Sequence, residues 1–246
     1  MKEISWKDNL RIVWLGSFLT GACISLVVPF MPIFVEQLGV EPSQVTFYSG
    51  LAISVSAISA ACVSPLWGIL ADRYGRKPMM IRAGLAMTIT MGGLAFVPNV
   101  YWLLALRLLN GVFTGFVPNA TALIASQVPK DKSGYALGTL SSGVVAGTLT
   151  GPFVGGMIAE VFGIRNVFLM VGGFLFLAAI LTIFFIKEDF QPVPKEKALP
   201  TKELFTSVKY PYLLFNLFAT SFVIQVAAQS IGPILALYVR DLGQKE

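Results

Sequence analysis

The sequence predicts an all-α membrane protein: a bundle of six transmembrane helices followed by the first helix of a second bundle. Three observations predict this fold class. The chain of 246 residues is 55% hydrophobic and 13% charged, with a mean hydropathy of +0.74, whereas soluble globular proteins carry about 25% charged residues. Seven apolar runs each provide the roughly 20 residues that a helix needs to cross a bilayer. Basic residues gather in alternate segments between these runs.

The seven apolar runs define the predicted helices in order. They lie at about 12–38, 46–67, 79–97, 101–125, 134–160, 165–186 and 210–239. A barrel strand would have about 10 residues of alternating polarity, so these longer, continuous runs are predicted helices. The polar segment before the last run contains Pro192, Pro194 and Pro200, which is typical of a linker. We therefore predict a six-helix bundle over 1–186, a cytoplasmic linker over 187–209, and a seventh helix that starts a truncated C-terminal bundle over 210–246.

The charges of the connecting segments predict how the helices are oriented. With the N-terminus inside the cell, 14 Lys and Arg residues fall in cytoplasmic segments and three fall outside. Cytoplasmic segments carry the excess of Lys and Arg, so the N-terminus is predicted to be cytoplasmic. We expect a multi-pass protein of the plasma membrane, surrounded by lipid and with no nucleic-acid partner. The sequence has no histidine, nucleophile–base pair, phosphate loop or metal-ligand spacing, so no enzyme, cofactor or metal site is expected.

An internal repeat relates the two halves of the predicted bundle. Residues 68–75 read GILADRYG, and residues 156–163 read GMIAEVFG. The first copy is predicted to lie inside the cell and the second outside. Two three-helix units of opposite orientation are therefore predicted, as in the inverted repeats of secondary transporters. The alternative is chance recurrence in a membrane sequence rich in Gly and Ala.

The loop between the second and third runs carries an ordered motif that we interpret as a gating loop. Its glycines permit a tight turn and close helix approach, and its carboxylate is expected near a helix N-terminus. Its cations are suited to carboxylates and anionic lipid. The alternative is a basic loop that only sets topology. The residues of the motif are Gly68, Asp72, Arg73, Gly75, Arg76 and Lys77.

Arg107 lies about six residues into the fourth apolar run. A lone cation in the membrane costs roughly 3 kcal/mol on insertion scales, so we expect its side chain to face the bundle interior and a partner. Asn110 and Thr114 share its helical face and are candidates for lining a substrate cavity. The alternative is that Arg107 extends to the outer membrane interface.

The fifth apolar run, 134–160, contains a spaced glycine motif made of Gly138, Gly147, Gly151, Pro152, Gly155 and Gly156. Glycines at 143, 147, 151 and 155 lie on one face, which lets another helix pack backbone to backbone. Pro152 removes the hydrogen bond to the carbonyl of Thr148 and can bend the helix. The alternative is ordinary small-residue packing with no role in transport.

These motifs resemble those of the major facilitator superfamily. The loop from Gly68 to Lys77 is similar to the family signature between helices 2 and 3, and the segment around Arg107 looks like its helix 4 motif. The glycine pattern of 134–160 is similar to the antiporter motif of drug exporters, and Pro29 and Pro32 in the first run also look like this group. The chain therefore resembles the N-terminal half, plus helix 7, of a twelve-helix drug:proton antiporter.

The resemblance implies a secondary active transporter. It would export amphipathic or cationic drugs in exchange for protons by alternating access, and it would be monomeric when full length. Arg107 would take part in proton coupling. The alternatives are a metabolite uniporter or symporter of the same superfamily, and a truncated chain that acts as a non-transporting membrane partner.

Two features depart from the family pattern. Ser126 and Ser133 stand where the family often has an acid and an Arg, so Asp131 is an alternative partner for the basic loop. No Asp or Glu lies deep in any run, so the proton carrier is expected outside this chain or at Glu36. In the last run, Asn216, Gln225 and Gln229 either bond a neighbouring helix or face substrate.

Overall fold

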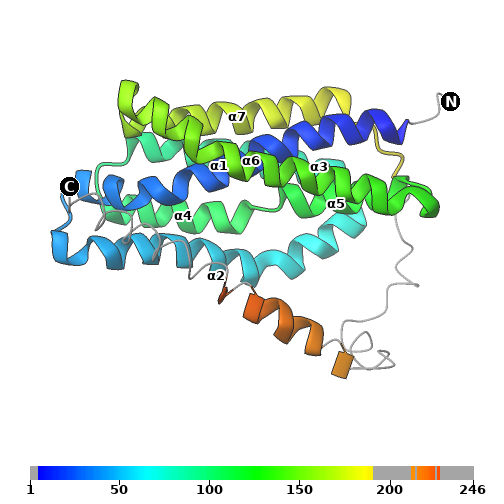
Figure 1. The fold of residues 1–246 in the computed structure, drawn as a ribbon, viewed down its shortest axis with the longest axis horizontal. Helices are drawn as coiled ribbons and strands as arrows, with labels where there is room; N and C mark the ends of the chain where they lie inside the picture. The colour runs from blue at the N-terminus through cyan, green and yellow to red at the C-terminus, as the bar shows by residue number, and fades with distance from the viewer. Residues whose placement is uncertain (1–4, 191–211, 214, 225, 228–246) are drawn as a thin grey trace, which may run out of the picture. The chain divides into compact units, whose positions relative to one another are not determined.

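The computed structural model describes residues 5–190, 212–213, 215–224 and 226–227. In the first of these ranges the chain forms seven α-helices and two short 3-10 turns (Figure 1). The elements are α1 (Trp6–Gln37), α2 (Pro42–Tyr74), α3 (Arg76–Gly93), η1 (Leu94–Phe96), α4 (Val100–Phe113), α5 (Phe116–Gln127), η2 (Lys130–Lys132), α6 (Ser133–Phe162) and α7 (Ile164–Phe185).

Six segments of the described chain are long and apolar enough to cross a membrane. They coincide with the first six predicted runs, which confirms the predicted class of all-α membrane protein. The chain divides into two compact units, Met1–Pro192 and Val193–Glu246. In the second unit, the described part of the predicted seventh helix includes an apolar helix at Phe215–Ile224. The rest of the predicted 210–239 helix lies outside the described residues.

The fourth predicted helix differs from the expectation, because the structure divides 101–125 into α4 and α5. Thr114 has extended backbone, and Gly115 has a φ of 132°, a conformation that L side chains rarely adopt. Pro118 has no N–H to bond the carbonyl of Thr114 four residues earlier. Glycine and proline at this spacing interrupt the helix without interrupting the apolar run, so hydropathy alone missed the break.

The main helix contacts follow the predicted repeat. The first span packs mainly on the fifth (α1 on α6), the second on the fourth (α2 on α4), and the third on the sixth (α3 on α7). The predicted repeat relates the first span to the fourth, the second to the fifth and the third to the sixth. Under this exchange the α1–α6 contact becomes the α2–α4 contact, and the α3–α7 contact is unchanged. This pattern is the one that an inverted repeat requires.

The two repeat loops also share a backbone conformation. Gly75 has φ 97° and ψ 166°, and Gly163 has φ 81° and ψ 161°. Each donates its N–H to the carbonyl four residues earlier, Ala71 and Ala159, at 3.0 Å. Both φ values lie in the region that favours glycine. This shared backbone geometry favours an internal repeat over the alternative of chance sequence similarity.

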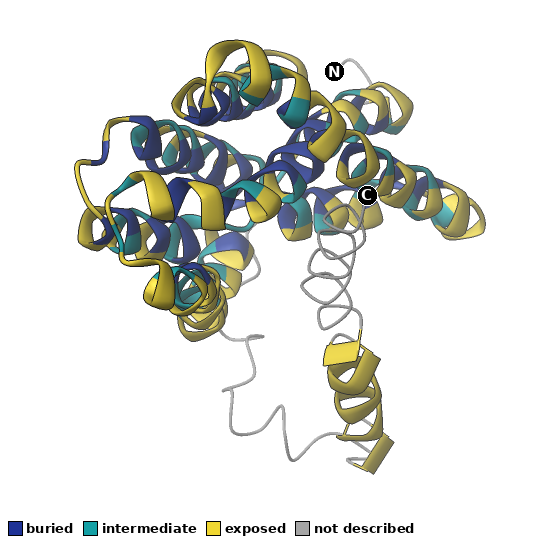
Figure 2. Cartoon of the chain, turned by 60° about the vertical axis from the view of Figure 1, so that its left-hand side comes forward, coloured by how far each residue is buried: buried dark blue, intermediate teal, exposed yellow. Residues whose placement is uncertain are grey.

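Most of the buried apolar side chains fall into two clusters in the first unit. One includes Phe34 of α1 against Phe168 of α7, with ring centroids 4.6 Å apart, and the other includes Met80 and Phe116. Buried residues gather where helices face one another, and exposed residues line their outer sides (Figure 2). α2 buries only Ser49, Ala52 and Ala71, so most of its surface is left uncovered by this unit.

Candidate functional site

The predicted gating loop joins α2 to α3 through Gly75. Asp72 lies in the last turn of α2 and pairs with Arg76 at the start of α3, with 2.5 Å between Oδ1 and Nη2. Arg73 points its guanidinium over the ring of Tyr74 at 5.4 Å. Gly68 lies on the open side of α2, where an added Cβ would meet nothing within 4 Å. Within this unit, therefore, Gly75 makes the tight turn and Gly68 makes no close approach.

Asp72 lies beside Arg76 at the start of α3, as expected, but the acid that caps the backbone of α3 is Glu188. The carboxylate of Glu188 accepts the backbone N–H groups of Arg76 and Lys77, each at 2.7 Å. These two N–H groups belong to the first turn of α3, where a helix has no internal acceptors, and a negative charge there is favourable. In the sequence, Glu188 belongs to the predicted polar linker, and no pattern near it indicates this contact.

Lys77 ties the same loop to the end of α7. Its Nζ donates to the carbonyls of Ile183 at 2.9 Å and Ile186 at 2.7 Å. A cation at a helix C-terminus satisfies carbonyls that lack internal donors. The start of α3 and the end of α7 therefore hold each other. The described hydrogen bonds that Arg76 and Lys77 donate go to Glu188, to Asp72 and to the carbonyls at the end of α7. Asp131, the alternative partner of the basic loop, lies in η2 and is not among these partners.

Arg107 of α4 lies in the bundle interior, as expected, and does not extend to the interface. Only 7% of its surface is exposed. Its Nε donates to the carbonyl of Ala52 at 3.2 Å, and its Nη1 lies 3.8 Å from the sulfur of Met91. Within the described residues no carboxylate pairs with it. In the part of the chain that the structure describes, its oxygen partner is thus a backbone carbonyl of α2.

The polar residues that follow Arg107 pack against neighbouring helices. Asn110 is buried, and its Oδ1 accepts from the hydroxyl of Thr90 on α3 at 3.1 Å. The hydroxyls of Ser56 and Ser59 donate to the carbonyls of residues 107 and 108 at 2.7 and 3.0 Å. An added Cβ at Gly111 would collide with the carbonyl of Ser56. Small side chains therefore bring α2 and α4 into close contact.

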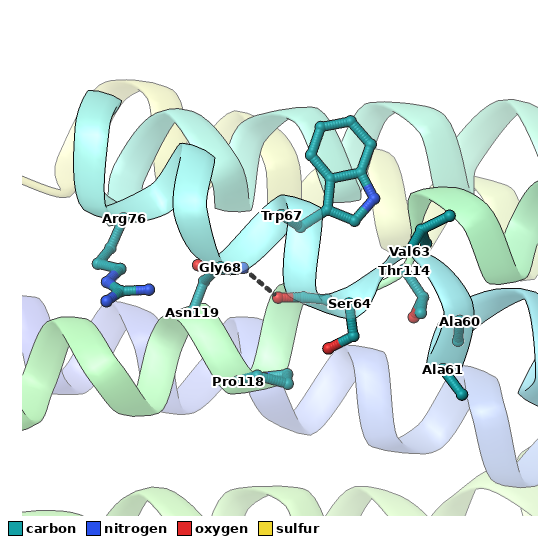
Figure 3. A pocket seen from close by; sticks show the side chains of 11 residues that line it. Ala60, Ala61, Val63, Ser64, Trp67, Gly68, Arg76, Thr114, Pro118 and Asn119 are labelled. Carbon is teal, nitrogen blue, oxygen red and sulfur yellow. Dashed lines mark hydrogen bonds between the residues drawn. The ribbon is translucent and has the colours of Figure 1, made fainter. Parts of the chain in front are cut away.

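A pocket of about 360 Å³ lies beside the break between α4 and α5 (Figure 3). It brings together Gly68 and Arg76 of the gating loop with Thr114, one of the predicted cavity residues. Asn110 is not among its lining residues, and Gln225 and Gln229 lie outside the described residues. The residues that line it are Ala60, Ala61, Val63, Ser64, Trp67, Gly68, Arg76, Thr114, Gly115, Pro118 and Asn119.

Trp67 of α2 and Arg82 of α3 form a carbonyl clamp on the broken end of α4. The indole N–H of Trp67 donates to the carbonyl of Val112 at 2.7 Å. One guanidinium nitrogen of Arg82 donates to the carbonyls of Phe113 at 3.3 Å and Thr114 at 3.1 Å. The guanidinium also stacks over the ring of Trp67 at 3.5 Å. The clamp supplies donors to three consecutive carbonyls at the break, and no spacing in the sequence predicts it.

The glycine motif of α6 packs onto α1 along one face. Added Cβ atoms at Gly147 and Gly151 would collide with the backbone carbonyls of Phe18 and Ala22 on α1. Gly143 and Gly155 also lie on this face, against Trp14 and Leu26. In contrast, an added Cβ at Gly138 or Gly156 would meet nothing within 4 Å. The motif therefore contains a contact row and two positions that this unit leaves open.

Pro152 is exposed, and its missing N–H is compensated from α1. The hydroxyl of Ser25 donates to the carbonyl of Thr148 at 2.7 Å, which is the carbonyl that Pro152 leaves without its helical donor. α6 remains one helix through this position. The proline thus adds a hydrogen bond between α1 and α6.

The family model of the Major Facilitator Superfamily matches residues 13–245. The chain belongs to the major facilitator superfamily. This membership places the chain among membrane transporters and not among enzymes, in agreement with the fold and with the loop, Arg107 and glycine motifs described above.

Curated relatives match all or nearly all of the length of this superfamily member. It is 85% identical over 246 residues to the multi-drug resistance efflux pump PmrA of Streptococcus pneumoniae serotype 4, covering 100% of this chain and 62% of that protein. It is 54% identical over 241 residues to a PmrA homolog of Lactococcus lactis subsp. lactis, covering 98% and 60%. Multidrug resistance protein MdtG of Klebsiella pneumoniae is 50% identical over 240 residues, covering 97% and 58%. The chain therefore spans about three fifths of these relatives.

Two solved structures of the same superfamily share the fold at low sequence identity. The human organic anion transporter MFSD10 (TETRAN) superposes with a TM-score of 0.66 at 19% identity, over 82% of this chain and 53% of that one. The POT family transporter PepTSo superposes with a TM-score of 0.68 at 15% identity, over 78% and 40%. These likenesses support the fold alone.

Proposed function

We propose that the full-length protein exports amphipathic or cationic drugs in exchange for protons by alternating access. The observation that carries this proposal is the 85% identity, along the whole chain, to a protein named as a multi-drug resistance efflux pump. The 50% and 54% identities to further multidrug resistance proteins support it. The protein would work as a monomer in the plasma membrane with a cytoplasmic N-terminus.

The proposed mechanism assigns a sealing role to the contact between α1 and α6. The backbones of the two helices touch at Gly147 and Gly151, so this pair moves as one wall of the cavity. A second bundle, beginning in the predicted 210–246 segment and joined by a cytoplasmic linker over 187–209, would rock against it. Thr114, Asn110, Gln225 and Gln229 are the proposed cavity residues.

The gating loop would act as a latch on the cytoplasmic side. Asp72 is 63% exposed in its side chain while its ion pair with Arg76 is formed, so it is available to a second partner. Glu188 and Lys77 hold the other side of the loop to α7. The latch would therefore work from a base that is fixed within the first bundle.

Arg107 would serve proton coupling as a buried charge without a carboxylate partner among the described residues. A proton antiporter needs a group that titrates within reach of both sides of the membrane. Glu36 lies at the end of α1 and is exposed. We therefore propose that the proton carrier lies in the part of the relatives that this chain does not span, or is Glu36.

Two substitutions test these roles in cells that make the full-length protein. Asp72→Asn and Arg107→Ala are each expected to abolish efflux of a preloaded cationic dye and to leave membrane insertion intact. Asp8→Asn is the control for Asp72→Asn, because Asp8 is also an exposed acid in an ion pair, in this case with Arg11 of the same helix at 3.4 Å. Wild-type efflux by either test variant would contradict the assignment. Net uptake of a sugar or an acid would favour the uniporter or symporter alternative, and insertion without any transport would favour the non-transporting partner.

A further inference from the structure

A groove opens between α1 and α6 at the end of the bundle where both helices begin. Its origin lies in one row of α6, in which every fourth residue faces α1. Gly147 and Gly143 in this row allow close contact with α1, but the row continues toward the helix start with Thr139 and Tyr135. Side chains replace hydrogen atoms at these two positions, so the two helix backbones cannot approach as closely here as they do at Gly147.

The resulting cavity has a volume of about 700 Å³ and combines cations with interfacial aromatic rings. We call it the interfacial groove. Its lining residues are Trp6, Lys7, Leu10, Arg11, Trp14, Lys132, Tyr135 and Thr139. Three of the eight side chains are cationic, and three are the Trp or Tyr residues that prefer the headgroup level of a bilayer.

The charges around the groove leave it positive. Arg11 pairs with Asp8 on its own helix at 3.4 Å, with both side chains more than two thirds exposed, so solvent screens this pair strongly. Asp131 precedes Lys132 in η2, which also carries Lys130. Lys7 lies 5.8 Å from the ring centroid of Trp6. Among the described residues of the two helix starts, four cations therefore outnumber two acids, and three of these cations line the groove.

We propose that the interfacial groove binds the phosphate headgroup of an anionic phospholipid. Lys7, Arg11 and Lys132 would contact the phosphate, because clustered cations between helices suit anionic headgroups. Trp6, Trp14 and Tyr135 would lie against the glycerol and the first acyl carbons. A free phosphate ion would leave this apolar and aromatic part of the lining unused. The proposal rests on the proposed orientation, which puts this end of the bundle in the cytoplasmic leaflet.

The test measures lipid binding by the purified full-length protein and requires no transport. Native mass spectrometry would compare phosphatidylglycerol with phosphatidylcholine, whose headgroup has no net charge. We expect preferential retention of phosphatidylglycerol. Each cation near a membrane surface is worth about 1 kcal/mol, so Lys132→Gln and Lys7→Gln should each weaken phosphatidylglycerol binding about fivefold. Lys130→Gln is the matched control, because Lys130 lies in the same turn but does not line the groove.

Three outcomes would overturn the proposal. The first is equal retention of the two lipids, and the second is an equal loss of binding in Lys130→Gln and Lys132→Gln. The third is full displacement of phosphatidylglycerol by inorganic phosphate at millimolar concentration, which would identify a free-anion site instead. If the full-length protein prefers phosphatidylglycerol but exports no dye, the result contradicts the proposed function and leaves the lipid site intact. Failure of the proposed function and failure of the lipid proposal can therefore be told apart.

Discussion

Substitution of Gly147 by alanine gives a direct test of the contact between α1 and α6. An added Cβ at this position would overlap the carbonyl oxygen of Phe18 and would lie 2.9 Å from the backbone nitrogen of Ala22. Both neighbours are backbone atoms of α1, so neither can turn aside as a side chain could. Carbon contacts are optimal at about 3.5–4.0 Å, and α1 must therefore move away from α6 by about 1 Å.

The expected cost of Gly147→Ala follows from this displacement. Overpacking a close contact costs about 1–3 kcal/mol, while replacing glycine by alanine inside a helix contributes up to about 1 kcal/mol of stability. Gly138→Ala in the same helix gains the helix propensity of alanine without overpacking, because nothing lies within 4 Å of the added Cβ. The free energies of unfolding of the two variants should thus differ by about 1–3 kcal/mol.

The assay is thermal denaturation of the full-length protein in detergent, followed by size-exclusion chromatography. In domains of about 150–250 residues, 1 kcal/mol corresponds to about 2–4 °C in midpoint temperature, and the shift is smaller in a longer protein. We expect Gly138→Ala to match or exceed the wild type and Gly147→Ala to melt several degrees below Gly138→Ala. Equal midpoints for the two variants would refute the close packing of α6 on α1.

Three further substitutions test the contacts that the structure adds, each by the same thermal assay. Glu188→Gln should lower the free energy of unfolding by about 1–2 kcal/mol, because it removes a charged acceptor from the N-terminus of α3, whereas Asp189→Asn, at an exposed position, should be neutral. Trp67→Phe should cost about 1–3 kcal/mol by leaving the carbonyl of Val112 without its donor, while Trp102→Phe, at a 60% exposed position, should cost less. Ser25→Ala should cost about 1 kcal/mol, and less in a Pro152→Ala background, where a backbone N–H again reaches the carbonyl of Thr148; equal costs in both backgrounds would contradict that compensation.

The features that could be predicted from the sequence are those that repeat along one helix or between two. Hydropathy located the six membrane spans of the described unit, since each needs about 20 apolar residues. The offset between residues 68–75 and 156–163 identified a repeat whose loops share the geometry of Gly75 and Gly163. The row of glycines from Gly143 to Gly155 indicated a close helix contact, because residues spaced four apart lie on the same face of a helix.

The features that were missed depend on contacts between residues distant in the chain. Glu188 lies 112 residues from Arg76, and nothing near it in sequence indicates that it caps another helix. The clamp of Trp67 and Arg82 exists because two different helices approach the broken end of α4. The break between α4 and α5 has a local signal in Gly115 and Pro118. Membrane helices often tolerate both residues, so their presence in the sequence does not predict that the helix is interrupted.

Efflux of a preloaded fluorescent cationic dye, with and without a protonophore, tests the proposed drug:proton exchange most directly. The measurement uses cells that make the full-length protein, with membrane insertion verified in the same cells. We predict dye extrusion that collapses when the protonophore removes the proton gradient. Extrusion that persists without the gradient, or no extrusion by an inserted protein, would contradict proton-driven drug export.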